Sequence, residues 1–237
     1  MFLITALVSS TASSAARTAN PQNLLSEENC QLVVEILRIL YNFLSQFDGH
    51  NDNNGEEHAM LAEVSRQLVG CHCETRDRHL EVTKHCCNLW TLLPSKLAHI
   101  LVPAADELND VSKVQRSFLG HDVTAIFEIL SYLEMLLKDV SVRAQQDQLL
   151  PVLLPLTTLC KSNRIIRKYC RCQTTSDSFA PLKDEVKQLP EEGNSLRNKF
   201  CKLLTSTVTQ VKHVAADFLY VLCKENVSRL IKYTGFW

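Results

Sequence analysis

Apolar residues recur at helical spacing along most of this 237-residue chain. Between Leu24 and Phe47 they return every three or four positions, which places them on one face of a helix. Alternating apolar and polar runs bounded by turn residues, which mark strands, are hard to find. The pattern therefore predicts an all-α fold. The apolar face of this first helix consists of Leu32, Val33, Ile36, Leu37, Leu40, Phe43 and Leu44.

The same spacing predicts further helices before the middle of the chain. They are expected over residues 56–69, 78–92 and 123–137, with a short helix between Pro94 and Pro103. The sharp joint at Pro94 is typical of two antiparallel helices that pack side by side.

Two later segments extend the helical pattern. Residues 149–160 are apolar almost all round, as expected of a helix buried between neighbours, and Pro155 is expected to bend it. Residues 208–223 instead have an apolar side and a polar side that includes Lys212 and Asp217.

The strongest apolar helices follow one another as candidate inner helices of stacked repeats. The first spacing is close to the roughly 40–47 residues of an armadillo or HEAT unit, and the later spacings are longer. We therefore predict an irregular α-solenoid over residues 24–237, with a compact helical bundle as the alternative. The candidate inner helices lie at residues 32–46, 78–93, 147–160 and 207–223.

Composition and charge limit the classes of protein that fit. With 46% hydrophobic residues the chain can bury a sizeable core, and it does not resemble a disordered protein. The formal net charge is −1, but from Lys161 onward 14 Lys and Arg stand against 7 Asp and Glu. This asymmetry indicates a basic C-terminal face for an acidic partner, with ordinary solvated helix faces as the alternative.

The ten cysteines indicate the redox compartment. Most lie inside helical patterns, as Cys160, Cys170, Cys201 and Cys223 do, and a buried free cysteine behaves as a small hydrophobic residue. The apolar start of the chain has no Lys or Arg before it, which argues against a secretory leader. No apolar stretch approaches the roughly 18 residues that span a bilayer. We expect a cytoplasmic protein with reduced thiols and no membrane span.

The sequence lacks the familiar motifs of nucleotide binding and hydrolysis. GxxxxGK[ST], GxGxxG, GxSxG and HExxH are all missing, so we expect no catalytic residues and no cofactor. One Cys/His cluster has enough ligands for zinc, but its CxC and CC spacing differs from the paired CxxC of structural zinc sites. Coincidence is therefore the favoured interpretation. The cluster consists of Cys71, Cys73, His79, His85, Cys86 and Cys87.

Cationic residues gather on adjacent turns of two predicted helices in the last third of the chain. Clustered cations bind phosphates, which makes nucleic acid one candidate ligand. The near-neutral chain has neither interleaved exposed aromatic residues nor a recognised nucleic-acid module, so we expect no nucleic-acid binding. The first cluster consists of Arg164, Arg167, Lys168 and Arg171, and the second of Arg197, Lys199 and Lys202.

Several motifs of the last third follow one another in a specific order. A basic "RKYCRCQ" helix precedes a linker with Pro181, then "GNSLRNK" at 193–199, then "VKHVAADFLYVLCKENVSRLIKYTG" at 211–235. This order resembles the synembryn family. Weaker matches run upstream, so the likeness spans nearly the whole chain, strongly after Cys160 and loosely before it. The upstream matches lie at residues 1–7, 33–43, 85–102 and 117–139.

The resemblance implies an armadillo-like solenoid that binds the α-subunits of heterotrimeric G proteins. Synembryns act as chaperones and guanine-nucleotide exchange factors for these subunits, and they hold the subunit's C-terminal helix in the concave groove of the solenoid. The implied activity is binding alone, so the protein would not be an enzyme that makes or breaks bonds. We expect a monomer in the cytoplasm that can be recruited to the cell cortex or plasma membrane.

The resemblance also suggests which residues contact the partner. A helix ending in a free carboxylate needs an apolar trough and nearby cations. In armadillo-like units an Asn near the end of the third helix often lines the groove. Asn42 fits that position with Arg38 one turn before it, and Asn88 lies one turn before Leu92, which departs from the pattern. Further candidates are Arg167, Arg197, Lys199, Lys212 and Asp217; each has an ordinary surface role as its alternative.

The resemblance also bears on the length of the chain and on the alternative function. Family members begin before the equivalent of Met1 and continue beyond that of Trp237, so we expect a truncated member. Residues 1–23 would be a partial helix and a Ser/Ala-rich segment. The alternative function is a generic α-solenoid scaffold that binds a helical or extended peptide without any influence on nucleotide.

Overall fold

The computed structural model of the chain describes residues 24–46, 55–105, 116–139, 141, 144–174 and 191–234. The chain divides into two compact units, Met1–Tyr132 and Leu133–Trp237. Helix α5 (Thr124–Asp139) crosses from one unit into the other. The predicted segment 1–23 lies outside the described residues.

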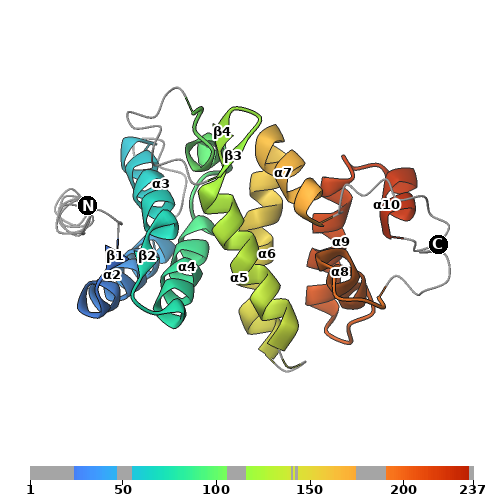
Figure 1. The fold of residues 1–237 in the computed structure, drawn as a ribbon, viewed down its shortest axis with the longest axis horizontal. Coiled ribbons are helices and arrows are strands. Elements are labelled where there is room, and N and C mark those ends of the chain that lie inside the picture. Colours follow the sequence, from blue (N-terminus) through green and yellow to red (C-terminus); the bar gives the residue numbers. More distant parts are fainter. Residues whose placement is uncertain are drawn as a thin grey trace. The chain divides into compact units, whose positions relative to one another are not determined.

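Unit 1 is built from helices with two very short strand pairs (Figure 1). Strands β1 (Leu24–Leu25) and β2 (His72–Cys73) pair in parallel, and β3 (Ser117–Phe118) and β4 (His121–Asp122) pair in antiparallel fashion. Its helices are α2 (Glu27–Gln46), α3 (Gly55–Gly70), α4 (Arg76–Trp90), the 3₁₀ helix η2 (Ser95–Leu101) and the first part of α5.

The paired strands β1 and β2 each precede a helix, and these two helices, α2 and α4, pack side by side (Figure 1). Leu24 pairs with His72, 48 positions later, and each strand runs almost directly into its helix. Near the start of both helices, Arg78 of α4 lies 2.6 Å from the Glu27 carboxylate of α2. The two strand–helix segments thus begin alike and lie next to each other, with α3 between them in the sequence.

Unit 2 packs two of the predicted inner helices directly against each other, namely α6 (Gln145–Ser162) and α9 (Thr209–Leu222). The Phe200 and Phe218 rings lie 5.1 Å apart between centroids, and both are fully buried. Such a pair stabilises the unit through buried apolar area and ring contact. The other helices are α7 (Arg164–Thr174), α8 (Leu196–Leu204), α10 (Val227–Thr234) and the end of α5.

The all-α prediction is confirmed, and the predicted helices occur close to their expected bounds. One packing prediction is wrong: the segment after Pro94 packs mainly against α3 and does not lie antiparallel beside α4. It is also a 3₁₀ helix of seven residues, since Pro94 and Pro103 leave too little chain for a longer helix. Its buried residues Leu97, Ala98 and Leu101 turn toward the core of unit 1.

Two other details of the apolar pattern differ from expectation. Leu32 was expected on the buried face of α2 but is 49% exposed, because the buried arc of that helix is centred on Val33, Leu37 and Leu40. The helix over 149–160 is not buried all round, since Leu154 is 47% exposed. In the described parts of the chain, no helix is both long enough and apolar enough to cross a bilayer.

Candidate functional site

Helix α7 carries a cationic face because its apolar and its cationic residues both recur every three or four positions, so each kind gathers on its own side of the helix. Buried Ile166, Tyr169 and Cys170 hold one side of the helix against unit 2. Asn163 begins the helix: its side-chain oxygen accepts hydrogen bonds from the backbone N–H groups of Ile165 and Ile166, at 2.8 and 3.2 Å. The face away from the core displays four cations at helical spacing, Arg164, Arg167, Lys168 and Arg171.

The end of helix α9 faces these cations across a pocket. Lys224 and Glu225 both adopt left-handed backbone conformations, with φ of 57° and 55°. The Glu225 N–H donates to the Tyr220 carbonyl at 2.9 Å and closes the helix end. Residues with a β-carbon disfavour this conformation, so two in succession form a strained turn.

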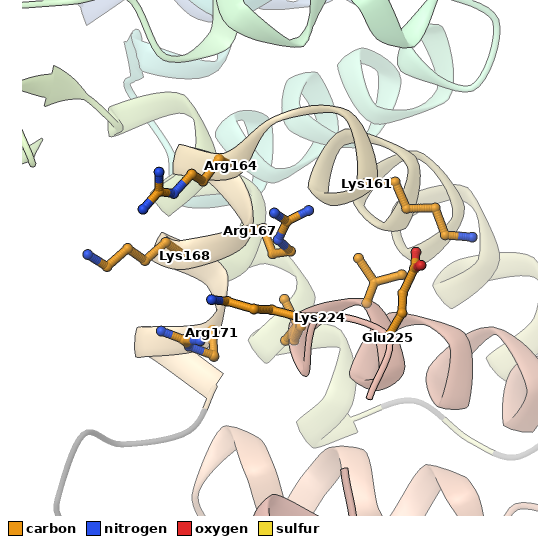
Figure 2. A pocket seen from close by; sticks show the side chains of 9 residues that line it. Lys161, Arg164, Arg167, Lys168, Arg171, Lys224 and Glu225 are labelled. Atoms are coloured by element: carbon orange, nitrogen blue, oxygen red, sulfur yellow. The ribbon is translucent and has the colours of Figure 1, made fainter. Parts of the chain in front are cut away.

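The pocket between these elements has a volume of about 610 Å³. Figure 2 shows Lys224 reaching from the turn toward α7. Arg167 lies between the other three α7 cations and Lys161. The lining residues are Lys161, Arg164, Arg167, Lys168, Arg171, Val221, Leu222, Lys224 and Glu225.

Positive charge in the pocket far exceeds negative charge. Six of the nine lining residues are cationic and one, Glu225, is acidic. Within the part of the chain that the structure describes, Arg164, Lys168 and Lys224 form no ion pair, whereas Arg167 donates to the Cys160 carbonyl at 3.2 Å. Nearby Arg229, followed by burial and then the cations of α7, lowers the pKa of Lys224. Gathered cations with so little compensation can bind an anion at small cost.

A second group of predicted residues lies on the α2–α4 pair of unit 1. Arg38 of α2 is half exposed and pairs with Glu35 at 2.9 Å, while Asn42 is exposed one turn later. Asn88 of α4 is half-buried, and its backbone carbonyl accepts a hydrogen bond from the Thr91 hydroxyl at 2.6 Å. Among the described residues the side-chain amides of Asn42 and Asn88 make no hydrogen bond, so both remain available to a ligand.

His85 of α4 lies three positions before Asn88 and senses the charge of Arg38 on α2. Burial lowers the pKa of His85, and the cations Arg38 and Lys84 lower it further. Arg38 of α2 and His85 of α4 are thus close enough for their charges to interact. Asn42 lies one turn after Arg38 on α2, and Asn88 lies three positions after His85 on α4, so the candidates occupy two helices that pack against each other.

The remaining predicted contact residues lie elsewhere in unit 2 and do not line the pocket. Lys199 is only 13% exposed, and its ammonium lies 2.9 Å from the Glu134 carboxylate of α5. This hydrogen bond lowers the pKa of Glu134, so the charge of Lys199 already serves the scaffold. Arg197 and Lys212 are half-buried on α8 and α9, and Asp217 is exposed on α9.

The Cys/His cluster at 71–87 separates into different environments in the structure. Cys71 and Cys73 approach Cys30 of α2, and burial raises the pKa of Cys71 to about 11. His79 instead contacts Glu128 at 3.1 Å and the Cys71 carbonyl at 3.0 Å. Over the described ranges, no three His, Cys, Asp or Glu side chains gather in a way that could hold a metal ion.

The sequence predicted the α7 cations but missed the three other charged residues of the pocket. Lys161 lies at the end of α6, and Lys224 and Glu225 lie just beyond α9. The "CKEN" segment at 223–226 gives a weak signal, since Asn, rather than Lys or Glu, is the usual residue for a left-handed turn. Their convergence depends on how α6, α7 and α9 pack, which no local pattern encodes.

Comparison with known proteins places the whole chain in one family. The profile of the family described as guanine nucleotide exchange factor synembryn matches residues 1–236. The chain is 36% identical over 216 residues to chaperone Ric-8A of Xenopus tropicalis, covering 90% of this chain and 38% of the relative. It is 35% identical over 219 residues to that of Danio rerio, covering 90% and 37%.

A mammalian relative gives the same result. Chaperone Ric-8A of Mus musculus is 36% identical over 221 residues, which cover 92% of this chain and 39% of the relative. The chain thus spans less than two fifths of the length of these relatives. The family match over 1–236 and the predicted motifs agree: the chain belongs to the synembryn family.

Proposed function

We propose that this chain acts as a guanine-nucleotide exchange factor and folding chaperone for the α-subunits of heterotrimeric G proteins. The observation that carries the proposal is the family match over residues 1–236, since that family is described as a guanine nucleotide exchange factor. The relatives named as chaperones support the second part of the proposal.

The proposed mechanism is binding, with no bond made or broken. If the chain binds the nucleotide-free α-subunit more tightly than the nucleotide-loaded form, the affinity of the subunit for nucleotide falls by the same factor. Each tenfold preference corresponds to about 1.4 kcal/mol. The same preference would hold a newly made, empty subunit in a folded state, which unites exchange and chaperone activity.

We assign the C-terminal helix of the α-subunit to the α2–α4 surface. Ile39 is 57% exposed on α2, next to the polar positions Arg38 and Asn42. An amphipathic helix that ends in a carboxylate needs apolar contact and a cation, and this surface offers both. The Arg38–Glu35 pair is exposed, and such pairs contribute only about 0.2–1 kcal/mol, so Arg38 can turn to a ligand carboxylate at little cost.

We test the assignment with a fluorescent peptide that copies the C-terminal helix of an α-subunit. Arg38→Glu should weaken its binding about tenfold or more, because a charge-assisted hydrogen bond becomes a repulsion. The matched control is Arg76→Glu, which reverses another exposed arginine of unit 1 at the start of α4. Equal losses of peptide affinity in the two variants would show that Arg38 does not contact the peptide.

The release of GDP from purified α-subunit, with and without the chain, tests the function itself. Faster release supports the exchange factor. Unchanged release together with retained peptide binding would identify a scaffold instead. Because these relatives are much longer than this chain, a second arm adds a full-length relative as the positive control.

We further propose a monomer that acts in the cytoplasm and can be recruited to the cell cortex or plasma membrane. This assignment rests on the proposed function. Analytical ultracentrifugation of the chain should give a single species of the monomer mass, 26.8 kDa. A dimer of twice that mass would contradict the proposal.

A further inference from the structure

We infer that the cationic pocket of unit 2 is a binding site for a small, multiply phosphorylated anion of the inositol-polyphosphate class, either free or as a lipid headgroup. The inference goes beyond the proposed exchange function and does not depend on it. It rests on the charge, size and composition of the pocket.

The charge of the pocket requires a ligand with several negative charges. Six cations converge and Glu225 supplies one carboxylate. In Figure 2 the Glu225 side chain lies near Lys161, yet the described residues form no ion pair there. A single carboxylate would neutralise one of these cations, whereas phosphate groups carry more charge and more acceptor oxygens each.

The shape of the pocket favours a small molecule. About 610 Å³ lies within the roughly 300–1,000 Å³ typical of small-molecule sites. Lys161 lies across Arg167 from the other α7 cations, and Lys224 reaches toward α7 from the turn after α9 (Figure 2). A ligand in this pocket can contact cations from α6, α7 and that turn together, which differs from a single row of cations along a nucleic-acid backbone.

The composition of the pocket separates an inositol polyphosphate from a nucleotide. None of its nine lining residues is aromatic, and the apolar contribution comes from Val221 and Leu222 alone. A nucleobase gains much of its binding free energy by stacking on an aromatic ring, and this pocket offers none. An inositol ring that carries phosphates on several sides needs no such platform, because cations on each side can bind it.

The first experiment measures binding of inositol hexakisphosphate to the full chain by isothermal titration calorimetry, with ATP and inorganic phosphate as competitors. We expect saturable binding that ATP displaces poorly. Arg164→Glu, at an exposed position on the pocket, should lower the affinity at least about tenfold. Lys202→Glu makes the same change of charge at an exposed site of α8 outside the pocket and should leave the affinity within about twofold.

The second experiment distinguishes the two sources of the ligand. Sedimentation with phosphatidylcholine vesicles that contain phosphatidylinositol 4,5-bisphosphate is compared with titration of soluble inositol 1,4,5-trisphosphate. Vesicle binding that Arg164→Glu abolishes assigns the pocket to a lipid headgroup. Binding of the soluble compounds alone assigns it to a free inositol polyphosphate.

Three results would overturn the inference. These are equal losses in Arg164→Glu and Lys202→Glu, ATP binding as tight as that of the inositol compounds, or binding of a phosphorylated peptide where inositol polyphosphates do not bind. If Arg164→Glu does not fold by circular dichroism, the double variant Lys168→Gln and Lys224→Gln replaces it, since it removes two pocket charges without reversing any. A rise in Tm with added inositol hexakisphosphate, absent in that double variant, gives an independent readout.

Discussion

Two groups of cations, one in each unit, differ in how they are compensated. In unit 1, Arg66 and Arg78 are partly buried and each contact a carboxylate, and Arg78 bridges Glu27 and Glu81 at 2.6 Å each. At the pocket of unit 2, Arg164, Lys168 and Lys224 form no ion pair with any described residue.

This difference separates cations that stabilise the fold through ion pairs from cations that are available to bind an anionic ligand. A paired, partly buried arginine stabilises the fold, and its loss leaves a carboxylate uncompensated. Unpaired cations held close together repel one another and weaken the free protein, and an anionic ligand removes that repulsion.

Alkaline pH should have the largest effect, and it should act on both units alike. Burial raises the pKa of Cys86 to about 12 and that of Cys201 to about 11, from an ordinary value near 9. A thiol whose folded pKa is raised stabilises the fold below pH 9, and this contribution is lost as the pH rises toward the folded value. Each such thiol lowers the free energy of unfolding by about 1.4 kcal/mol per pH unit in that window.

Urea unfolding under reducing conditions from pH 8 to pH 10 measures this effect. Because cysteines in both units share the raised pKa, the free energy of unfolding should fall by several kcal/mol in total, and the urea midpoint should fall with it. A midpoint that stays level to pH 10 would show that the thiols ionise as readily in the folded chain as in the unfolded one.

Arg66→Ala should have the next largest effect, by about 2–4 kcal/mol of unfolding free energy. The guanidinium is 17% exposed, contacts Glu63 at 2.6 Å and lies 3.7 Å from Asp122, which is 9% exposed. Burial opposes its charge, yet the hydrogen bonds to Glu63 and the Asp122 carboxylate hold the pKa of Arg66 above its ordinary value.

Chemical denaturation of Arg66→Ala beside Arg76→Ala measures the loss. Arg76 is exposed in the first turn of α4, so its removal should change the stability by less than about 0.5 kcal/mol. Equal losses of unfolding free energy in the two variants would show that the partly buried ion pairs of Arg66 do not stabilise the fold.

The sequence predicted the helices and the cationic face of α7, because both are local patterns with a period of 3.6 residues. It did not predict the environment of Lys199, since the ion pair with Glu134 joins residues 65 positions apart. Nor did it predict that Lys161 and Lys224 meet the α7 cations, because that convergence depends on packing between α6, α7 and α9. The exposed side of α2 at Leu32 was missed because the apolar arc is wider than the buried arc.

Lys224→Gly should have the smallest effect, and its sign should be opposite to that of Arg66→Ala. Glycine adopts the left-handed conformation of residue 224 without penalty, and the substitution also removes one cation from a repulsive group. The Tm of the ligand-free chain should therefore rise by about 2–4 °C, measured by differential scanning calorimetry.

The matched control for this variant is Glu225→Gly, which relieves the second left-handed residue but removes the acidic side chain of the pocket. Both variants gain backbone stability, yet their effects on inositol hexakisphosphate should differ: Lys224→Gly weakens binding and Glu225→Gly strengthens it. That opposition separates charge from backbone strain, because a purely conformational role for the turn would move both affinities in the same direction. A fall in Tm for Lys224→Gly would instead show that Lys224 stabilises unit 2, as the paired arginines stabilise unit 1, and the contrast between the two units would fail at that residue.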